Sequence, residues 1–150
     1  MSSGLVRAAA VIAIGAAAPF VAACAPVETS VLLNELTWQG GGKLELAGTT
    51  SASVDLSGWT VRREVGGLGF TFASGVTLAP GAHLVLTQPT DPPFALSKND
   101  SVILEDQTGL RIDQILFDDN QAEVSYCRVP DAEGPWALCA RPTFGEANPP

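Results

Sequence analysis

The sequence predicts an all-β domain, either a sandwich or a barrel, and three observations support this prediction. From Val31 onward, short apolar runs alternate with glycine- and proline-rich turn signals at close spacing, as in β-sandwiches and barrels. Apolar and polar residues alternate within 59–65, which is the two-residue period of a half-buried strand. No segment keeps a helical period over three turns, so no helices are expected.

The expected strands are separated by residues that favour turns. Examples are Gly40-Gly41-Gly42, Gly66-Gly67, Pro80-Gly81 and the breaker run Pro89–Pro93. In chain order, the expected strands are Val31–Trp38, Lys43–Leu46, Trp59–Val65, residues 70–72, Val76–Leu78, His83–Thr87, Ser101–Glu105, Arg111–Phe117, Glu123–Arg128 and Trp136–Ala140.

The segment before these strands has the proportions of a signal peptide. Met1–Arg7 carries one positive charge, and Ala8–Ala18 is apolar and is followed by Pro19. This apolar stretch is too short for a transmembrane helix, which needs about 20 apolar residues. We therefore expect residues 1–23 to be removed from the mature protein.

The residues at the end of this segment indicate a lipid anchor. Val21-Ala22-Ala23-Cys24 resembles the lipobox of bacterial lipoproteins, in which an aliphatic and two small residues precede a cysteine. The resemblance implies a diacylglycerol thioether on Cys24, and two or three acyl chains hold a protein firmly in a bilayer. The alternative is an ordinary secretory signal that is cleaved after Ala23 and leaves a free thiol.

The expected layout is therefore a signal peptide at 1–23, a lipidated N-terminus and linker at 24–30, and one β-domain at 31–148. Ala25–Ser30 reaches about 20 Å when fully extended, so the domain is expected close to the membrane. Position 25 is Ala rather than Asp. In a host with two membranes, the family's sorting rules would favour the outer one, with the domain facing the periplasm or the exterior.

The chain has three cysteines, an odd number for an exported protein. If Cys24 carries lipid, Cys127 and Cys139 remain to pair in an oxidising compartment. An antiparallel hairpin that opposes them would be centred on Glu133, in the turn-rich run Pro130–Pro135. A metal site is the alternative for these two cysteines, although no nearby histidine or Cys-x-x-Cys pattern supports it.

The charge of the chain argues against nucleic acid as a partner. The formal net charge is −8, and the only basic residue before Cys24 is Arg7, so the mature part is more acidic still. Binding to phosphates depends on Lys and Arg, and anionic lipid headgroups would repel the same surface. The remaining candidate partners are the membrane, through the lipid, and a protein or glycan of the envelope.

The sequence predicts no catalytic site. His83 is the only histidine, it follows Pro80-Gly81-Ala82 at the start of a strand, and it is expected to be structural or exposed. The chain has no Gly-x-Ser-x-Gly elbow, no His-Glu-x-x-His and no phosphate-binding glycine loop. A hydrolase with dispersed carboxylates is an alternative, but only 7% of residues are aromatic, which is few for a sugar cleft.

The acidic loops make calcium the one candidate cofactor. Asp118-Asp119-Asn120, together with Glu105-Asp106 and Asp113, offers hard oxygen ligands. The spacing does not match an EF-hand, and acidic loops are more often simply solvated. The main expectation is therefore no metal and no cofactor, with a calcium-binding adhesion module as the alternative.

A series of short motifs carries a resemblance that spans about Val31 to Asn148. In chain order these motifs are Leu33-Asn34-Glu35-Leu36, Leu44-Glu45-Leu46, Val54-Asp55-Leu56-Ser57-Gly58-Trp59, Leu78-Ala79-Pro80-Gly81, Leu84-Val85-Leu86, Phe94-Ala95-Leu96, Asp100-Ser101-Val102-Ile103-Leu104, Gly109, Asp113, Arg128, Trp136 and Gly145 to Asn148. Together they resemble the lamin tail domain family in its bacterial extracellular form. The chain departs from the family pattern at Ala47-Gly48, where an aromatic and an Asn are common, and at Phe144, where a Pro is common.

The resemblance implies an immunoglobulin-like β-sandwich without catalytic chemistry. The individual residues have structural interpretations. Asp55 and Ser57 are expected to bond their own backbone in a turn, Trp59 to lie in the core, and Asn34 and Glu35 to tie a loop or the chain terminus. We therefore expect a membrane-anchored, non-catalytic structural or interaction module of the cell envelope.

Overall fold

A computed structural model describes residues 29–39, 42–67, 69–87, 95–118 and 120–150. The predicted signal peptide, Cys24 and most of the linker lie outside the described residues, as do Gly40, Gly41 and the run Pro89–Pro93. In the described part of the chain, every regular element is a β-strand.

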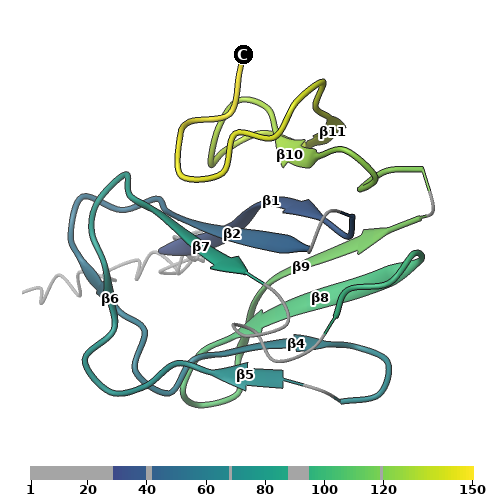
Figure 1. Ribbon diagram of the computed structural model, residues 1–150. Helices are drawn as coiled ribbons and strands as arrows, with labels where there is room; N and C mark the ends of the chain where they lie inside the picture. Colours follow the sequence, from purple (N-terminus) through teal and green to yellow (C-terminus); the bar gives the residue numbers. More distant parts are fainter. Residues whose placement is uncertain (1–28, 40–41, 68, 88–94, 119) are drawn as a thin grey trace, which may run out of the picture.

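The strands form two main antiparallel sheets and one small one. The first sheet has the order β11-β10-β1-β2-β7 and the second has the order β5-β4-β8-β9, while β3 and β6 pair separately. The strands are β1 (Val31–Thr37), β2 (Lys43–Gly48), β3 (Val54–Asp55), β4 (Thr60–Arg63), β5 (Gly69–Thr71), β6 (Thr77–Leu78), β7 (His83–Thr87), β8 (Asp100–Glu105), β9 (Arg111–Phe117), β10 (Tyr126–Arg128) and β11 (Trp136–Leu138). The two main sheets lie in separate layers (Figure 1), which confirms the predicted β-sandwich.

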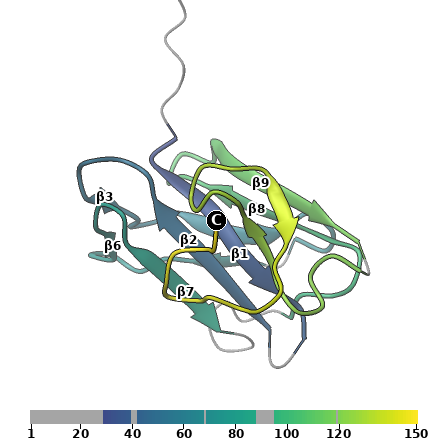
Figure 2. The same cartoon turned by 90° about the horizontal axis from the view of Figure 1, so that it is seen from above.

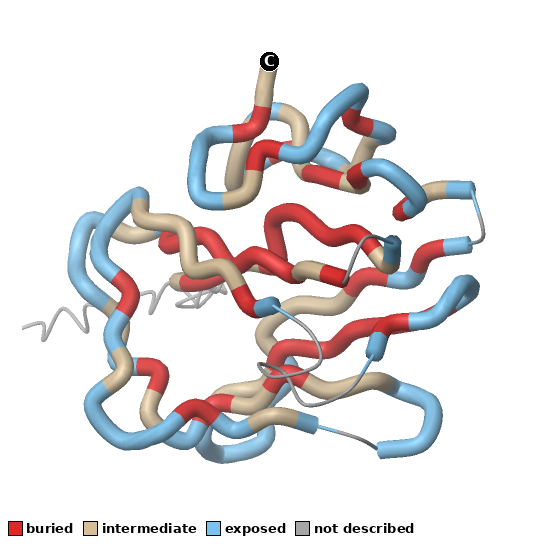
Figure 3. Tube along the Cα trace, viewed as in Figure 1, coloured by how far each residue is buried: buried red, intermediate tan, exposed pale blue. Residues whose placement is uncertain are grey.

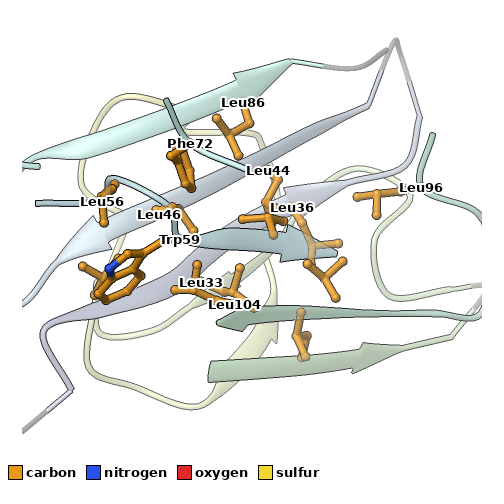
Figure 4. Packing of buried hydrophobic residues seen from close by; sticks show 14 of the residues in the cluster. Leu33, Leu36, Leu44, Leu46, Leu56, Trp59, Phe72, Leu86, Leu96 and Leu104 are labelled. Carbon is orange, nitrogen blue, oxygen red and sulfur yellow. The ribbon is translucent and has the colours of Figure 1, made fainter. Parts of the chain in front are cut away.

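The hydrophobic core lies between the two sheets (Figure 4). Neighbouring strands of the first sheet place leucines in register on its inner face, where Leu33 opposes Leu46 and Leu36 opposes Leu44. All four are fully buried. Alternate residues of a strand point to opposite faces of the sheet, so Glu45, between Leu44 and Leu46, points to the outer face.

The predicted strands are largely confirmed, with two main differences. β7 and β9 have the predicted bounds. The strand β3 was not predicted, because a two-residue strand has no readable period. The strand expected at Glu123–Arg128 begins only at Tyr126, since β10 pairs with β1 only at Leu36↔Tyr126 and Glu35↔Cys127.

The turn before β4 is built as its residues predict. Asp55 Oδ1 accepts hydrogen bonds from the Ser57 backbone N–H at 2.9 Å and from Ser57 Oγ at 2.5 Å. Gly58 has a φ of 75°, a conformation in which a side chain is strained. Trp59 directly precedes β4 and is only 6% exposed, so its predicted place in the core is confirmed.

Residues 139–150, called the C-terminal segment below, cross over the first sheet. Figure 2 shows this segment passing above β1 and β2, and Figure 3 shows buried positions within it. The outer face of β1 and β2 is therefore covered rather than exposed to solvent.

Candidate functional site

An irregularity in β1 turns two polar residues toward the covered outer face. The register between β1 and β2 shifts between Leu33 and Glu35, so Asn34 is an extra residue in β1, as in a β-bulge. Leu33 and Leu36 both keep their places in the core. As a result, Glu35 lies directly opposite Glu45 on β2, and both glutamates are completely buried.

The carboxylate of Glu35 joins two segments that are distant in sequence. It accepts a hydrogen bond from the Ser125 hydroxyl. The Thr143 backbone N–H donates to its two oxygens at 3.0 and 3.1 Å, and the Thr143 hydroxyl lies 3.1 Å from Oε2. Glu35 therefore holds both the residues just before β10 and the C-terminal segment against β1.

The carboxylate of Glu45 makes a second attachment to the C-terminal segment. Its Oε2 accepts the Gly145 N–H at 2.6 Å, and its Oε1 accepts the Asn34 amide at 2.8 Å. Burial raises the pKa of Glu45 above its ordinary value of 4.5, and nearby Glu35 adds to the rise, although the two hydrogen bonds and His83 oppose it.

A third carboxylate, Asp131, gathers donors from three parts of the chain. Its Oδ1 accepts the Asn34 amide at 2.9 Å and the Asn148 N–H at 3.0 Å, and its Oδ2 lies 3.1 Å from His83 Nε2. Burial alone would raise the pKa of Asp131, but the bonds from Asn148, Asn34 and His83 outweigh it and lower the pKa below 3.8. The structural role expected for Asn34 and Glu35 is thus confirmed, and His83 is part of the same network.

On the other face of β1, Arg128 links the two sheets. Its Nη2 lies 2.9 Å from Asp113 Oδ2 on β9, its Nε donates to the Leu33 carbonyl at 2.8 Å, and its Nη1 donates to the Gly134 carbonyl at 3.0 Å. Asp113 Oδ2 also accepts the Leu33 N–H at 2.9 Å. Both backbone groups of Leu33, at the irregular point of β1, are therefore satisfied by side chains.

The shifted pKa values predict a pH dependence of stability with two opposite components. Glu45 holds its proton more tightly in the folded protein than in the unfolded chain, so protonated Glu45 adds to the free energy of unfolding. This stabilisation is fully present below pH 4.5 and is lost as the pH rises through the raised pKa. Glu45→Gln is expected to remove this decline in the free energy of unfolding, measured by urea denaturation from about pH 2 to 8 so that the acid range below 3.8 is included.

Asp131 has the opposite effect on stability and serves as the comparison for Glu45. Ionised Asp131 adds to the free energy of unfolding above pH 3.8, and this stabilisation is lost as the pH falls through the lowered pKa. Asp131→Asn should therefore flatten the acid limb of the same profile and keep the decline due to Glu45. A Glu45→Gln profile parallel to that of the wild type would contradict this assignment.

Two of the segments that Glu35 joins form the walls of an open pocket at one end of the first sheet. The hollow has a volume of about 350 Å³. We call it the distal pocket, and its lining residues are Thr37, Gln39, Lys43, Glu123, Val124, Pro142 and Phe144. The Glu35 partners Ser125 and Thr143 directly adjoin these walls, because Ser125 follows Val124 and Thr143 lies between Pro142 and Phe144.

The distal pocket lies far from the point where the chain enters the domain. Val31 pairs with Gly48 at one end of the β1–β2 ladder, and Thr37 pairs with Lys43 at the other. Six residues of extended strand separate the two ends by about 20 Å. The pocket therefore opens at the end of the sheet opposite Val31.

Cys127 and Cys139 form a disulfide, as predicted, with their Cα atoms 6.1 Å apart. The predicted register needs a correction of two residues, which moves the centre of the hairpin by one. Cys127 pairs with Ala137, and Arg128 with Trp136, so the hairpin is centred on Ala132 rather than Glu133. Cys139 lies beyond the end of β11, and the disulfide crosses the hairpin diagonally.

Removal of this disulfide is expected to lower the free energy of unfolding by about 3 kcal/mol, because it frees a short loop in the unfolded chain. The double variant Cys127→Ala/Cys139→Ala, compared with the wild type by urea denaturation, measures the effect. Reductant should produce a similar loss in the wild type and none in the double variant. A loss below about 1 kcal/mol in both comparisons would be inconsistent with a stabilising disulfide.

The acidic residues considered for calcium have separate partners. Glu105 pairs with Arg62 at 2.6 Å, Asp106 Oδ1 accepts the Thr108 N–H at 2.8 Å, and Asp113 pairs with Arg128. Asp119 lies outside the described residues. Among the residues with described positions, no three His, Cys, Asp or Glu side chains are grouped so that they could hold a metal ion.

The same described ranges contain no helix that is long and apolar enough to span a membrane.

Sequence patterns identify some of this site and miss the rest. Asn34 and Glu35 were expected to tie distant segments, and they do. Asp113 was considered only as a calcium ligand, whereas it pairs with Arg128, a residue for which no role was predicted. The distal pocket was not predicted, because its residues come from three separate parts of the chain. One sequence signal could have pointed to the covered outer face of the sheet. It is Glu45, a charged residue between two leucines in a strand.

Comparison with known proteins supports the same fold. No curated protein matches the chain significantly. The profile of the Lamin Tail Domain family matches residues 25–119, which is more than half of the chain, and its immunoglobulin-like sandwich agrees with the two antiparallel sheets seen here. β10, β11 and the C-terminal segment follow the matched region. The chain belongs to the lamin tail domain family.

Proposed function

We propose that the mature protein is a non-catalytic interaction module that a lipid on Cys24 holds at the cell envelope. This proposal rests on the way in which the three cysteines are distributed between a disulfide and a free position. The domain joins Cys127 and Cys139 to each other, which leaves Cys24, directly after Val21-Ala22-Ala23, as the third thiol. A disulfide also fits an oxidising compartment outside the cytoplasm.

The domain suits a rigid platform for binding. Its outer sheet face is covered by a segment that buried carboxylates hold in place, and its core fills the space between the sheets. The partner is an envelope protein or glycan rather than nucleic acid, because the chain has a net charge of −8. The anchoring membrane is the cell membrane or, in a host that has one, the outer membrane.

Metabolic labelling tests the anchor. The protein is expressed with its signal peptide in a bacterial host that is fed an alkyne-bearing fatty acid, and mass spectrometry then identifies the mature N-terminus. We expect label on a mature chain that begins at Cys24 and no label on Cys24→Ser. Cys127→Ala/Cys139→Ala is the matched control and should still be labelled. A wild-type chain with an unmodified first residue would refute the lipid anchor.

A further inference from the structure

We propose that the distal pocket binds a short stretch of an uncharged glycan chain. This inference rests on the proposed function, since it names the class of partner that the anchored module would recognise. The pocket combines apolar walls, a few convergent polar groups and a size suited to a small ligand, which are the general features of small-molecule sites.

The shape and lining of the pocket fit a sugar ring. Val124, Pro142 and Phe144 supply apolar surface on two sides, against which the C–H face of a ring can pack. Val124 is 53% exposed, although a branched apolar side chain is more often buried. The volume of about 350 Å³ lies near the lower end of the range for small-molecule sites, as expected for a short part of a chain ligand.

The polar groups of the pocket match hydroxyl groups. Gln39 Nε2 donates to Glu123 Oε1 at 2.8 Å, and this bond joins the residues after β1 to those before β10. The amide oxygen of Gln39 and the second carboxylate oxygen of Glu123 can accept hydrogen bonds, and the Lys43 ammonium supplies donors. Sugar hydroxyls both donate and accept, so they can bond to both kinds of group.

The charges of the pocket favour an uncharged ligand. Among the described residues that line the pocket, two are charged: the cation Lys43 and the anion Glu123. The Lys43 ammonium lies 5.4 Å from the centre of the Phe144 ring, within cation–π distance. An anionic ligand would meet Glu123 and a cationic one Lys43, whereas a neutral polar ligand meets neither repulsion.

The pocket is held open by groups that do not line it. The buried carboxylate of Glu35 holds Ser125 and Thr143, next to the two apolar walls, and Glu45 holds Gly145 beside Phe144. Preformed walls reduce the loss of conformational freedom on binding. Because the pocket opens at the end of the sheet opposite Val31, a glycan away from the anchoring membrane can reach it.

Binding of uncharged trisaccharides to the full mature protein tests the inference. The probes are chitotriose, cellotriose and maltotriose, with trigalacturonate as the anionic comparison, and the detergent carries a phosphocholine rather than a sugar headgroup. We expect saturation-transfer NMR to show contact with at least one neutral probe. Titration should give an affinity for that probe at least about tenfold higher than for trigalacturonate.

Matched variants locate the contact. Glu123→Ala should weaken binding at least about tenfold by removing one charged hydrogen-bonding group. Glu133→Ala removes the same exposed side chain from the turn before β11 and should leave the affinity unchanged. Thermal melting of both variants confirms that they are folded.

Three results would overturn the inference: no contact with any neutral probe, binding that Glu123→Ala leaves intact, or tighter binding of the anionic probe. Binding of an uncharged peptide without any sugar would assign the pocket to protein ligands instead. These outcomes are independent of fatty-acid labelling, so a labelled protein that binds no sugar refutes the glycan site alone.

Discussion

Glu35→Ala is expected to lower the free energy of unfolding by about 4 kcal/mol, because the loss of a buried network is among the most destabilising of single changes. Glu35 is completely buried. The variant would leave the Ser125 hydroxyl and the Thr143 backbone N–H without their acceptor, while the Thr143 hydroxyl would keep only Asn148 Oδ1, at 2.8 Å. Each buried donor left unsatisfied costs about 1–3 kcal/mol.

Urea denaturation at neutral pH measures this loss, and Glu133→Ala is the control because it removes an exposed glutamate. A double-mutant cycle with Thr143→Ala isolates the contact between the Thr143 hydroxyl and Glu35, because the backbone N–H of residue 143 is kept in that variant. The two losses should not add, since each variant removes the same bond. A loss below about 1 kcal/mol for Glu35→Ala would mean that water replaces the carboxylate and that the network is not required for stability.

Arg128→Ala is expected to lower the free energy of unfolding by about 3–5 kcal/mol, as when one partner of a buried ion pair is removed. The side chains of Arg128 and Asp113 are only 14% and 12% exposed. The variant would leave the Asp113 carboxylate without its cation, although the carboxylate would still accept the Leu33 N–H. The carbonyls of Leu33 and Gly134 would each lose a charged donor.

Arg141→Ala is the control for this variant, since Arg141 is an exposed arginine in the C-terminal segment. We expect its effect to stay within about 0.5 kcal/mol. The companion variant Arg128→Lys keeps the charge but cannot reproduce the planar, forked set of donors, so it should recover only part of the loss. Equal stability of Arg128→Lys and the wild type would show that charge alone stabilises this contact.

The sandwich could be predicted from sequence because its strands are bounded by strong turn signals. β7, for example, begins after Pro80-Gly81-Ala82, and its predicted bounds agree with the structure. The prediction fails where pairing rather than local pattern sets the bounds. Glu123–Ser125 is not part of β10 because its bonds with β1 run through side chains, from the Thr37 hydroxyl to the Glu123 carbonyl and from the Ser125 hydroxyl to the Glu35 carboxylate.

The site was harder to predict than the fold, because its groups meet only in three dimensions. Asn34 and Glu35 were recognised as residues that tie segments together, but their partners Asp131 and Thr143 lie about a hundred residues away in sequence. The two-residue error in the register of the disulfide hairpin has a related cause. The spacing of two cysteines fixes the hairpin centre only if they directly oppose each other, and here they lie on a diagonal.

The attachment of residues 143–148 to β1 has a consequence for the order of folding. Glu35 meets Thr143 across 108 residues, and the Asn148 amide meets the Asn34 carbonyl across 114. During synthesis, and during the passage through an export channel that the proposed function implies, β1 emerges long before the residues that satisfy its polar groups. Contacts of such long range slow folding. The nascent chain is therefore expected to remain unfolded enough to pass through the channel until nearly all of the domain has emerged. It is expected to complete its native structure only after it has crossed the membrane.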